Sequence, residues 1–234
     1  RKKKYQLQYK HGLYPLQKIE GCKKNTFKYI FNLKDNFDEE LFYKNFLFID
    51  TETTGLAGGT GTVPFMIGLG YFKGDNFIVE QLLMRDFDEE LAVLKELKDI
   101  MDEFPLVVSF NGKSFDLPLI KTRLVMNRCD ELNIKCHLDL LHASRRIWSH
   151  LSSCSLTSLE EKILTITRNN YLPGSEVPGI YFDYLNHKRG EVLEPVFRHN
   201  LIDIVSLVTL LNHLKTIHEE DSECELNDRE LFNL

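Results

Sequence analysis

Apolar residues recur along the chain in short runs with two different spacings. Runs rich in branched and aromatic residues, each bounded by turn-forming residues, predict buried strands. Such strands are predicted at Phe46–Thr51, Val63–Phe72, Asn76–Met84, Leu106–Phe110 and Ile134–Leu138. The tetrapeptide Lys73-Gly74-Asp75-Asn76 joins the second run to the third and has the chemistry of a hairpin turn.

Apolar residues spaced three and four positions apart predict helices in the remaining segments. Within residues 86–104, Leu91, Leu94 and Leu97 share one face, and acidic residues occupy the first turn, where they favour the helix dipole. Helices are predicted over residues 86–104, Pro118–Met126, Leu140–Trp148, Leu156–Leu164, Pro178–Asn186 and 194–220. The predicted order is three strands, a helix, two further strands and a helical second half. This order predicts an α/β fold with a mixed five-stranded sheet flanked by helices.

The composition is that of a soluble globular protein. A chain of 234 residues suits one large domain, and 43% hydrophobic with 27% charged residues is typical of this class. The apolar runs are too short to span a bilayer, so we expect no membrane association. The five cysteines are scattered and lack C-x-x-C spacing, which argues against disulfides and structural zinc and favours a reducing cytoplasm.

Charge divides the chain into three parts. The first 24 residues hold eight of the 29 Lys and Arg residues but only one acid, Glu20, within a net charge of −6. We therefore expect a basic arm or extension at 1–44, a catalytic domain at 45–216, and an acidic tail or linker at 217–234 that leads to an additional domain. The arm would either contact phosphates or be a solvated, partly disordered terminus.

Two carboxylates lie at the end of the first predicted strand, in the sequence "FLFIDTETTGLAGG". Side chains alternate along a strand, so Asp50 and Glu52 point to the same side. Asp116 follows another strand, in "VVSFNGKSFDLPLI", at the head of a short helix. It could simply cap that helix. Neighbouring strand ends lie side by side, however, so Asp116 can also approach the first pair.

A histidine and a further aspartate lie four residues apart in "FRHNLIDIVSLV", so His199 and Asp203 share one face of the last helix. A lone histidine among apolar neighbours is usually structural. Four carboxylates in one cleft would repel each other strongly, and bound cations make such an arrangement tolerable. Oxygen ligands favour Mg²⁺ or Mn²⁺ over zinc.

The segments "DTETTG", "FNGKSFDLP" and "HNLID" resemble, in this order, the three exonuclease motifs of the DEDD 3′–5′ exonuclease superfamily, which has the ribonuclease-H-like fold. The middle segment is similar to the N-G-x-x-F-D motif of the proofreading domains of family B DNA polymerases. The surrounding "TGLAGGTGTVPFMIGLGYF", "HLDLLHASRRIW" and "CSLTSLEEKIL" resemble the bacterial YprB-like ribonuclease-H-like domain family. The resemblance covers roughly Phe46 to Leu214.

The resemblance implies a role for each matching residue. It makes Asp50, Glu52, Asp116 and Asp203 the ligands of two Mg²⁺ or Mn²⁺ ions, and His199 the residue that activates the attacking water. Three residues separate His199 from Asp203, whereas the histidine branch of the superfamily usually has four. A two-metal site stabilises both oxygens of an in-line displacement at phosphorus.

The resemblance also places the substrate. Backbone groups near Thr54 and Gly55 would hold the 3′-terminal nucleotide, while Leu56 would wedge against the last base or belong to the core. Asn111 would contact a nucleotide or merely start a turn. Further candidates are individually weak: Lys113, Arg145, Arg146 and Arg168 as phosphate contacts, and Asp139 and His142 as helix caps rather than ligands.

The expected function is therefore metal-dependent 3′–5′ exonuclease activity on nucleic acid. One alternative keeps the fold and the metals but cuts internally, as a ribonuclease H or a junction-resolving enzyme does. The other is a nucleic-acid-binding module without catalysis. The sequence does not decide between DNA and RNA, because recognition of a 2′-hydroxyl depends on the shape of the pocket.

Overall fold

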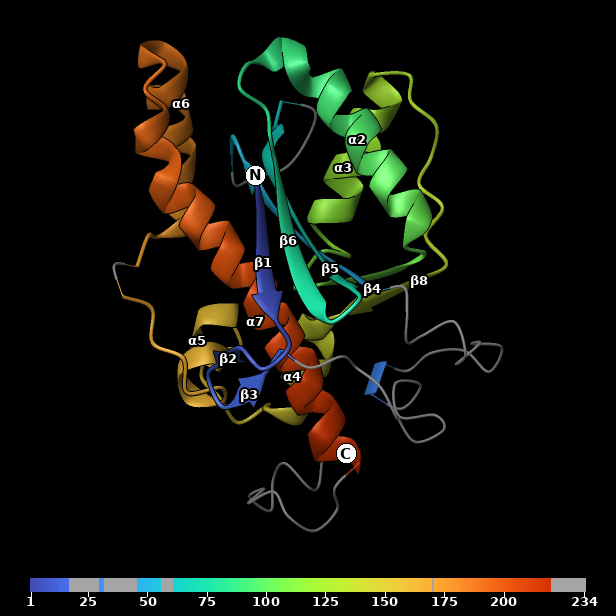
Figure 1. Cartoon of the computed structure of the whole chain (residues 1–234), viewed down its shortest axis with the longest axis vertical. Helices are drawn as coiled ribbons and strands as arrows, with labels where there is room; N and C mark the ends of the chain where they lie inside the picture. Colours follow the sequence, from blue (N-terminus) through green and yellow to red (C-terminus); the bar gives the residue numbers. More distant parts are fainter. Residues whose placement is uncertain (17–29, 32–45, 56–60, 170, 220–234) are drawn as a thin grey trace.

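The computed structural model describes residues 1–16, 30–31, 46–55, 61–169 and 171–219. Its centre is a mixed sheet in the order β1-β6-β5-β4-β7-β8 (Figure 1). The strands are β1 (Lys2–Gln6), β4 (Phe46–Thr53), β5 (Pro64–Lys73), β6 (Asn76–Leu83), β7 (Leu106–Ser109) and β8 (Cys136–Asp139). Strands β4, β5 and β6 form an antiparallel meander, and β7 and β8 continue the sheet in parallel with β4. The predicted α/β class and all five predicted strands are confirmed.

The sixth strand, β1, comes from the basic N-terminal segment. It pairs antiparallel with β6 over its whole length, Tyr5 is buried, and Lys2 Nζ lies 2.9 Å from Glu80 Oε2. A solvated, partly disordered terminus is therefore the wrong description of residues 1–16, because β6 offers them a free edge of backbone hydrogen bonds. Strands β2 (Lys10–His11) and β3 (Tyr14–Pro15) then form a small hairpin. The expected boundary at residue 44 lies outside the described residues, and the three-part division stays a prediction.

All six predicted helices are present, with small shifts at their ends. They are α2 (Glu90–Glu103), α3 (Asp116–Met126), α4 (Leu140–Ile147), α5 (Leu156–Lys162), α6 (Val177–His187) and α7 (Glu194–Glu219). Short 3₁₀ turns, η2 (Phe87–Glu89), η3 (Gly174–Glu176) and η4 (Gly190–Leu193), precede α2, α6 and α7. The expected acidic tail begins inside α7, since residues 217–219 are still helical. None of the described helices is long and apolar enough to cross a membrane.

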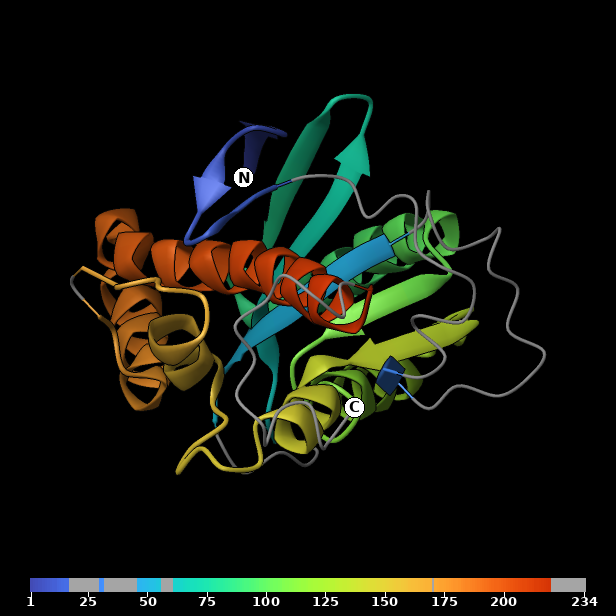
Figure 2. The same cartoon turned by 90° about the horizontal axis from the view of Figure 1, so that it is seen from below.

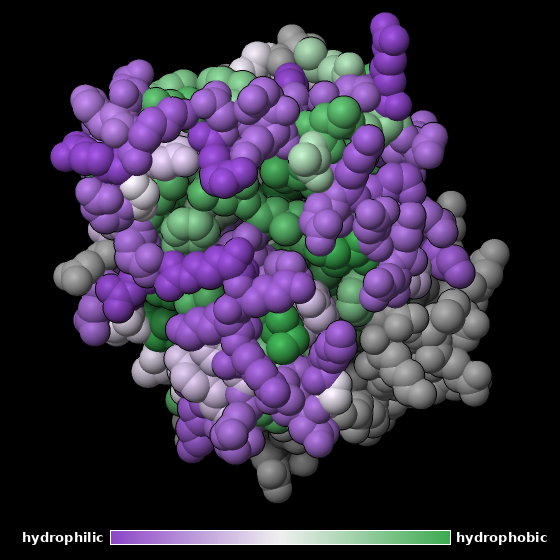
Figure 3. All heavy atoms as spheres, turned by 45° about the horizontal axis from the view of Figure 1, so that its top comes forward, coloured by the Kyte–Doolittle hydropathy of each residue, from purple (hydrophilic) through white to green (hydrophobic). Residues whose placement is uncertain are grey.

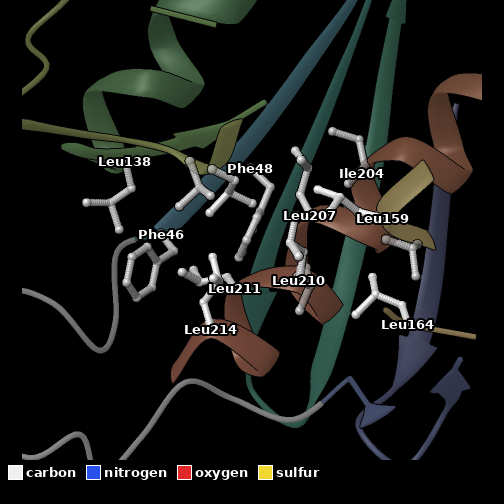
Figure 4. Packing of buried hydrophobic residues seen from close by; sticks show 14 of the residues in the cluster. Phe46, Phe48, Leu138, Leu159, Leu164, Ile204, Leu207, Leu210, Leu211 and Leu214 are labelled. Carbon is white, nitrogen blue, oxygen red and sulfur yellow. The ribbon is translucent and has the colours of Figure 1, made fainter. Parts of the chain in front are cut away.

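Helices cover both faces of the sheet. Phe46 and Phe48 of β4 face α7, where they meet leucines such as Leu207 and Leu211 (Figure 4). Leu47 and Ile49, which alternate with them on β4, point to the other face and pack against α2 and α3 in a second cluster. Figures 1 and 2 show α7 running across the sheet with α4 and α5 near it. The alternation along β4 therefore directs Asp50 and Glu52, which share the parity of Phe48, toward α7.

Candidate metal centre

Acidic residues from the end of β4 and from α7 converge in the interior. One ligand atom each from Glu52, His199 and Asp203 lie within 4.8 Å of one another. On α7, His199 Nε2 is 3.3 Å from Asp203 Oδ2, as their spacing of one helical turn predicts. Glu52 and Asp203 are buried, and His199 is partly buried. This group has the size and the chemistry to hold a cation.

Asp50 is oriented by an amide network. Asn200 Nδ2 donates to Asp50 Oδ2 at 2.9 Å, and Asn200 Oδ1 accepts from Gln81 Nε2 at 3.0 Å. Gly68 on the neighbouring strand makes room for this amide, because a Cβ there would lie 2.2 Å from Asn200 Oδ1. Strands β4, β5 and β6 together with helix α7 therefore fix the orientation of the Asp50 carboxylate.

Asp116 approaches from the opposite helical layer, outside the group of Glu52, His199 and Asp203 but near enough to raise the pKa of Asp50 and Glu52. Its Oδ1 accepts a hydrogen bond from Thr51 Oγ1, which points away from Asp50 and Glu52 on β4. It is the first residue of α3, and Phe115 occupies the N-cap without a side-chain hydrogen bond. The carboxylate is therefore held by a side chain of β4, and Asp116 is not the N-cap residue of its own helix.

The loop that carries Asp116 is anchored by Asp139 at the end of β8. Asp139 Oδ1 accepts from Asn111 N at 2.8 Å, and its Oδ2 accepts from Lys113 N at 3.0 Å. Its Oδ1 also accepts from Leu141 N at 3.1 Å, so the predicted role as cap of α4 is confirmed. Asn111 adopts a left-handed φ of 64°, a conformation that asparagine tolerates better than most residues.

The carboxylates of the site are buried away from water and repel one another. Burial, followed by repulsion from Asp203, Glu52 and Asp116, raises the pKa of Asp50 well above its ordinary value. Burial raises the pKa of Glu52 to about 8, with Asp203 and Asp116 adding to the shift. Burial also raises the pKa of Asp116 to about 6, although the hydrogen bond from Thr51 opposes it. A divalent cation would remove this penalty by pairing with the ionised forms.

One oxygen of the cluster has no partner among the described residues. Glu52 Oε1 is buried and accepts no hydrogen bond. Leaving a buried carboxylate oxygen unpaired costs free energy, and native structures rarely tolerate it without an ion or a water. The residues therefore fit an oxygen-ligated divalent cation.

The ordinary pKa of Glu52 is 4.5, and in the folded chain it is about 8. The metal-free chain is therefore expected to lose stability as the pH rises between these two values. Between these values the folded state keeps a proton that the unfolded state has released. The free energy of unfolding therefore falls as the pH rises. Thermal melts in a chelator check this, and Glu52→Gln should flatten the slope. A melting temperature that rises across this window in the wild-type chain would contradict it.

The expected substrate-contacting residues lie close in sequence to the cluster, but their roles stay predictions. The Thr54 amide donates to Val63 O, and its Oγ1 accepts from Val63 N, both at 3.0 Å. The Gly55 carbonyl accepts from Thr53 Oγ1 at 2.7 Å. Leu56 lies outside the described residues. The turn that these residues form is thus tied to the start of β5.

The four basic candidates differ in their surroundings. Arg168 is bound to Glu160 and Asp203, so its guanidinium is committed to carboxylates and not presented to solvent. Arg146 donates to the carbonyl of Ile30. Arg145 is exposed and lines a cavity of about 810 Å³ beside Asn111. Lys113, Arg145 and Arg146 are all exposed, and Arg145 is the one of the four candidates that lines this cavity.

Several residues of the site were not predicted from the sequence. Asn200 lies within "HNLID", and an asparagine in an apolar helix face was a usable signal. Thr51 gave none, because its partner Asp116 is 65 residues away, and Glu160 gave none, because its partners Arg168 and Ser206 lie on other segments, 8 and 46 residues away. His142 lies 3.9 Å from Asp139 on an exposed turn of α4.

Comparisons with known proteins identify the family and the fold. The RNase_H_2 family model, described as RNase_H superfamily, matches residues 47–215. The chain is 35% identical over 218 residues to the "Uncharacterized protein YprB" of Bacillus subtilis (strain 168), covering 92% of this chain and 52% of that protein. It thus spans about half the length of this relative.

Two DNA polymerases are also similar to the chain. A stretch of 38 residues, 16% of the chain and 4% of the other protein, is 55% identical to "DNA polymerase 1" of Aeropyrum pernix. The structure of the family B DNA polymerase from the archaeon Pyrobaculum calidifontis superimposes with a TM-score of 0.57 at 18% identity, over 73% of this chain and 24% of that one. At this identity the superposition is a likeness of fold.

Proposed function

The chain belongs to the RNase H superfamily, and we propose that it is a divalent-metal-dependent 3′–5′ exonuclease of the DEDD type acting on nucleic acid. Membership of this superfamily supports hydrolysis of nucleic acid. The observation that carries the finer proposal is the group of Glu52, His199 and Asp203, with Asp50 and Asp116 near enough that Asp203, Glu52 and Asp116 raise the pKa of Asp50. In this proposal the four carboxylates hold Mg²⁺ or Mn²⁺, two ions in all. Such ions, when bound, supply positive charge to both oxygens of an in-line displacement at phosphorus.

The chain's own residues have distinct tasks in the proposed reaction. The network from Gln81 through Asn200 holds Asp50 in one orientation, and the hydrogen bond from Thr51 does the same for Asp116. His199 accepts a proton from the attacking water. Its Nε2 lies 3.3 Å from Asp203 Oδ2.

A cavity beside the loop of Asp116 supports a polyanionic substrate. It has a volume of about 810 Å³ and is lined by Asn111, Arg145 and a serine-rich stretch at 149–155, with no acidic residue among the described residues that line it. Hydroxyl, amide and guanidinium groups are the usual partners of phosphates. On the face drawn in Figure 3, hydrophilic side chains predominate around smaller hydrophobic areas. We propose that the strand ending in the 3′ terminus enters along this cavity.

The proposal extends to the cellular setting. Cys129, Cys136 and Cys154 are free thiols, which supports a cytoplasmic location. A further domain is proposed because the chain matches about half of its relative from Bacillus subtilis.

Digestion of end-labelled single- and double-stranded DNA and RNA in Mg²⁺ or Mn²⁺ tests this function. We expect stepwise release of mononucleotides from the 3′ end and no digestion in a chelator. A substrate with a blocked 3′ end, or a circular one, should resist. Cleavage of the circle would favour the endonuclease, and binding without metal-dependent turnover would favour the non-catalytic module.

A further inference from the structure

Arg168 lies between two carboxylates at the rim of the acid cluster. Its Nε and Nη2 donate to Glu160 Oε2 and Oε1 at 2.5 and 2.6 Å, and Nη2 also donates to Asp203 Oδ1. The Arg168 side chain is only 6% exposed, and Glu160 is fully buried. A planar guanidinium is suited to bridge two carboxylates in this way, and an ammonium group is not.

Glu160 is in turn held from the N-terminal segment. Ser206 Oγ, on α7, donates to Glu160 Oε1. His11 Nε2, on β2, lies 2.8 Å from Ser206 Oγ. A continuous set of polar contacts therefore runs from the β2–β3 hairpin to Asp203.

The hairpin is seated firmly enough to support this set of contacts. Leu13 N donates to Leu164 O, two residues after α5, at 3.2 Å. Gly12, at φ 66°, lies so close that a Cβ would be 2.2 Å from Leu164 O. The hairpin thus touches the segment that joins Glu160 to Arg168.

We propose that Arg168, fixed by Glu160 and by the contacts of Ser206 and His11, is a positioning residue that holds Asp203 for metal binding. This role rests on the proposed function. With Oδ1 tied to the guanidinium, Asp203 keeps its Oδ2 3.3 Å from His199 Nε2, and Asp203 belongs to the group that includes Glu52. Residues that orient metal ligands are typically worth roughly 10–100-fold in metal affinity.

Arg168→Lys separates positioning from charge, because it keeps the positive charge and removes the fork that bridges two carboxylates. Titration of the metal-free protein with Mn²⁺ by calorimetry should show affinity lower by roughly 10–100-fold. Arg123→Lys is the matched control. Arg123 forms a similarly buried pair with Glu90, at 2.5 and 2.6 Å, about two turns along α3 from Asp116. We expect that control to bind Mn²⁺ as the wild type does.

Glu160→Gln provides a milder second variant, because it keeps the shape of the side chain and weakens its hold on Arg168. It should lower the Mn²⁺ affinity in the same direction, and His11→Ala should do so to a smaller extent. Thermal melts of each metal-free variant establish that it is folded at the titration temperature.

Unchanged Mn²⁺ affinity in folded Arg168→Lys and Glu160→Gln would overturn the positioning role, as would an equal loss in Arg123→Lys. A wild-type chain that binds Mn²⁺ but digests no nucleic acid would overturn the proposed function and leave the positioning role intact. A wild-type chain that binds no Mn²⁺ would overturn both.

Discussion

Asp50→Asn is expected to lower metal-dependent turnover by more than about 100-fold, since losing a metal ligand should exceed the loss of a residue that merely orients one. The metal-free variant should nevertheless melt at a higher temperature than the wild type. Burial and the charges of Asp203, Glu52 and Asp116 all disfavour the ionised Asp50 carboxylate, and a neutral amide avoids this penalty. An amide oxygen can still accept the hydrogen bond from Asn200.

Initial rates on a 3′-end-labelled strand and melts in a chelator measure the two effects together. Asp102→Asn is the matched control, because Asp102 is an acid on the surface of α2 that pairs with Lys98. Its rate and metal-free stability should be close to those of the wild type. Turnover retained in Asp50→Asn would remove this residue from the catalytic site.

His199→Ala is expected to lower turnover by roughly 10²–10⁴-fold, the usual contribution of general-base assistance. The imidazole lies 3.3 Å from Asp203 and within the group that includes Glu52, so it stands where a proton from the attacking water would be taken up. Substrate binding should change little.

Mn²⁺ affinity distinguishes the two roles that this position allows. If His199 is a general base, its removal leaves the Mn²⁺ affinity nearly unchanged. If His199 is a direct metal ligand, its removal lowers the Mn²⁺ affinity by more than about 10-fold. His187→Ala, at an exposed histidine of α6, serves as the control. If His199→Ala keeps near-normal turnover, the histidine is a packing residue and another group accepts the proton.

The local elements and the set of acids could be predicted from the sequence. Periods of two and of three to four residues are properties of single segments, so five strands and six helices were found without knowledge of their partners. The same alternation placed Asp50 and Glu52 on one side of β4, and helical spacing placed His199 beside Asp203. These inferences needed only the geometry of one element at a time.

The tertiary structure decided which partner each of these groups has. The strand of Lys2–Gln6 exists because β6 presents an unpaired edge, a fact that no local pattern of the N-terminal segment contains. Arg168 looked like a phosphate contact, yet it binds Asp203 and the buried Glu160, 35 and 8 residues away. Burial and pairing depend on which segments the fold brings together, and the free energy of a charged group depends on both. The sequence alone therefore predicted the candidate residues of the site, and only the assembled fold determined which groups orient them.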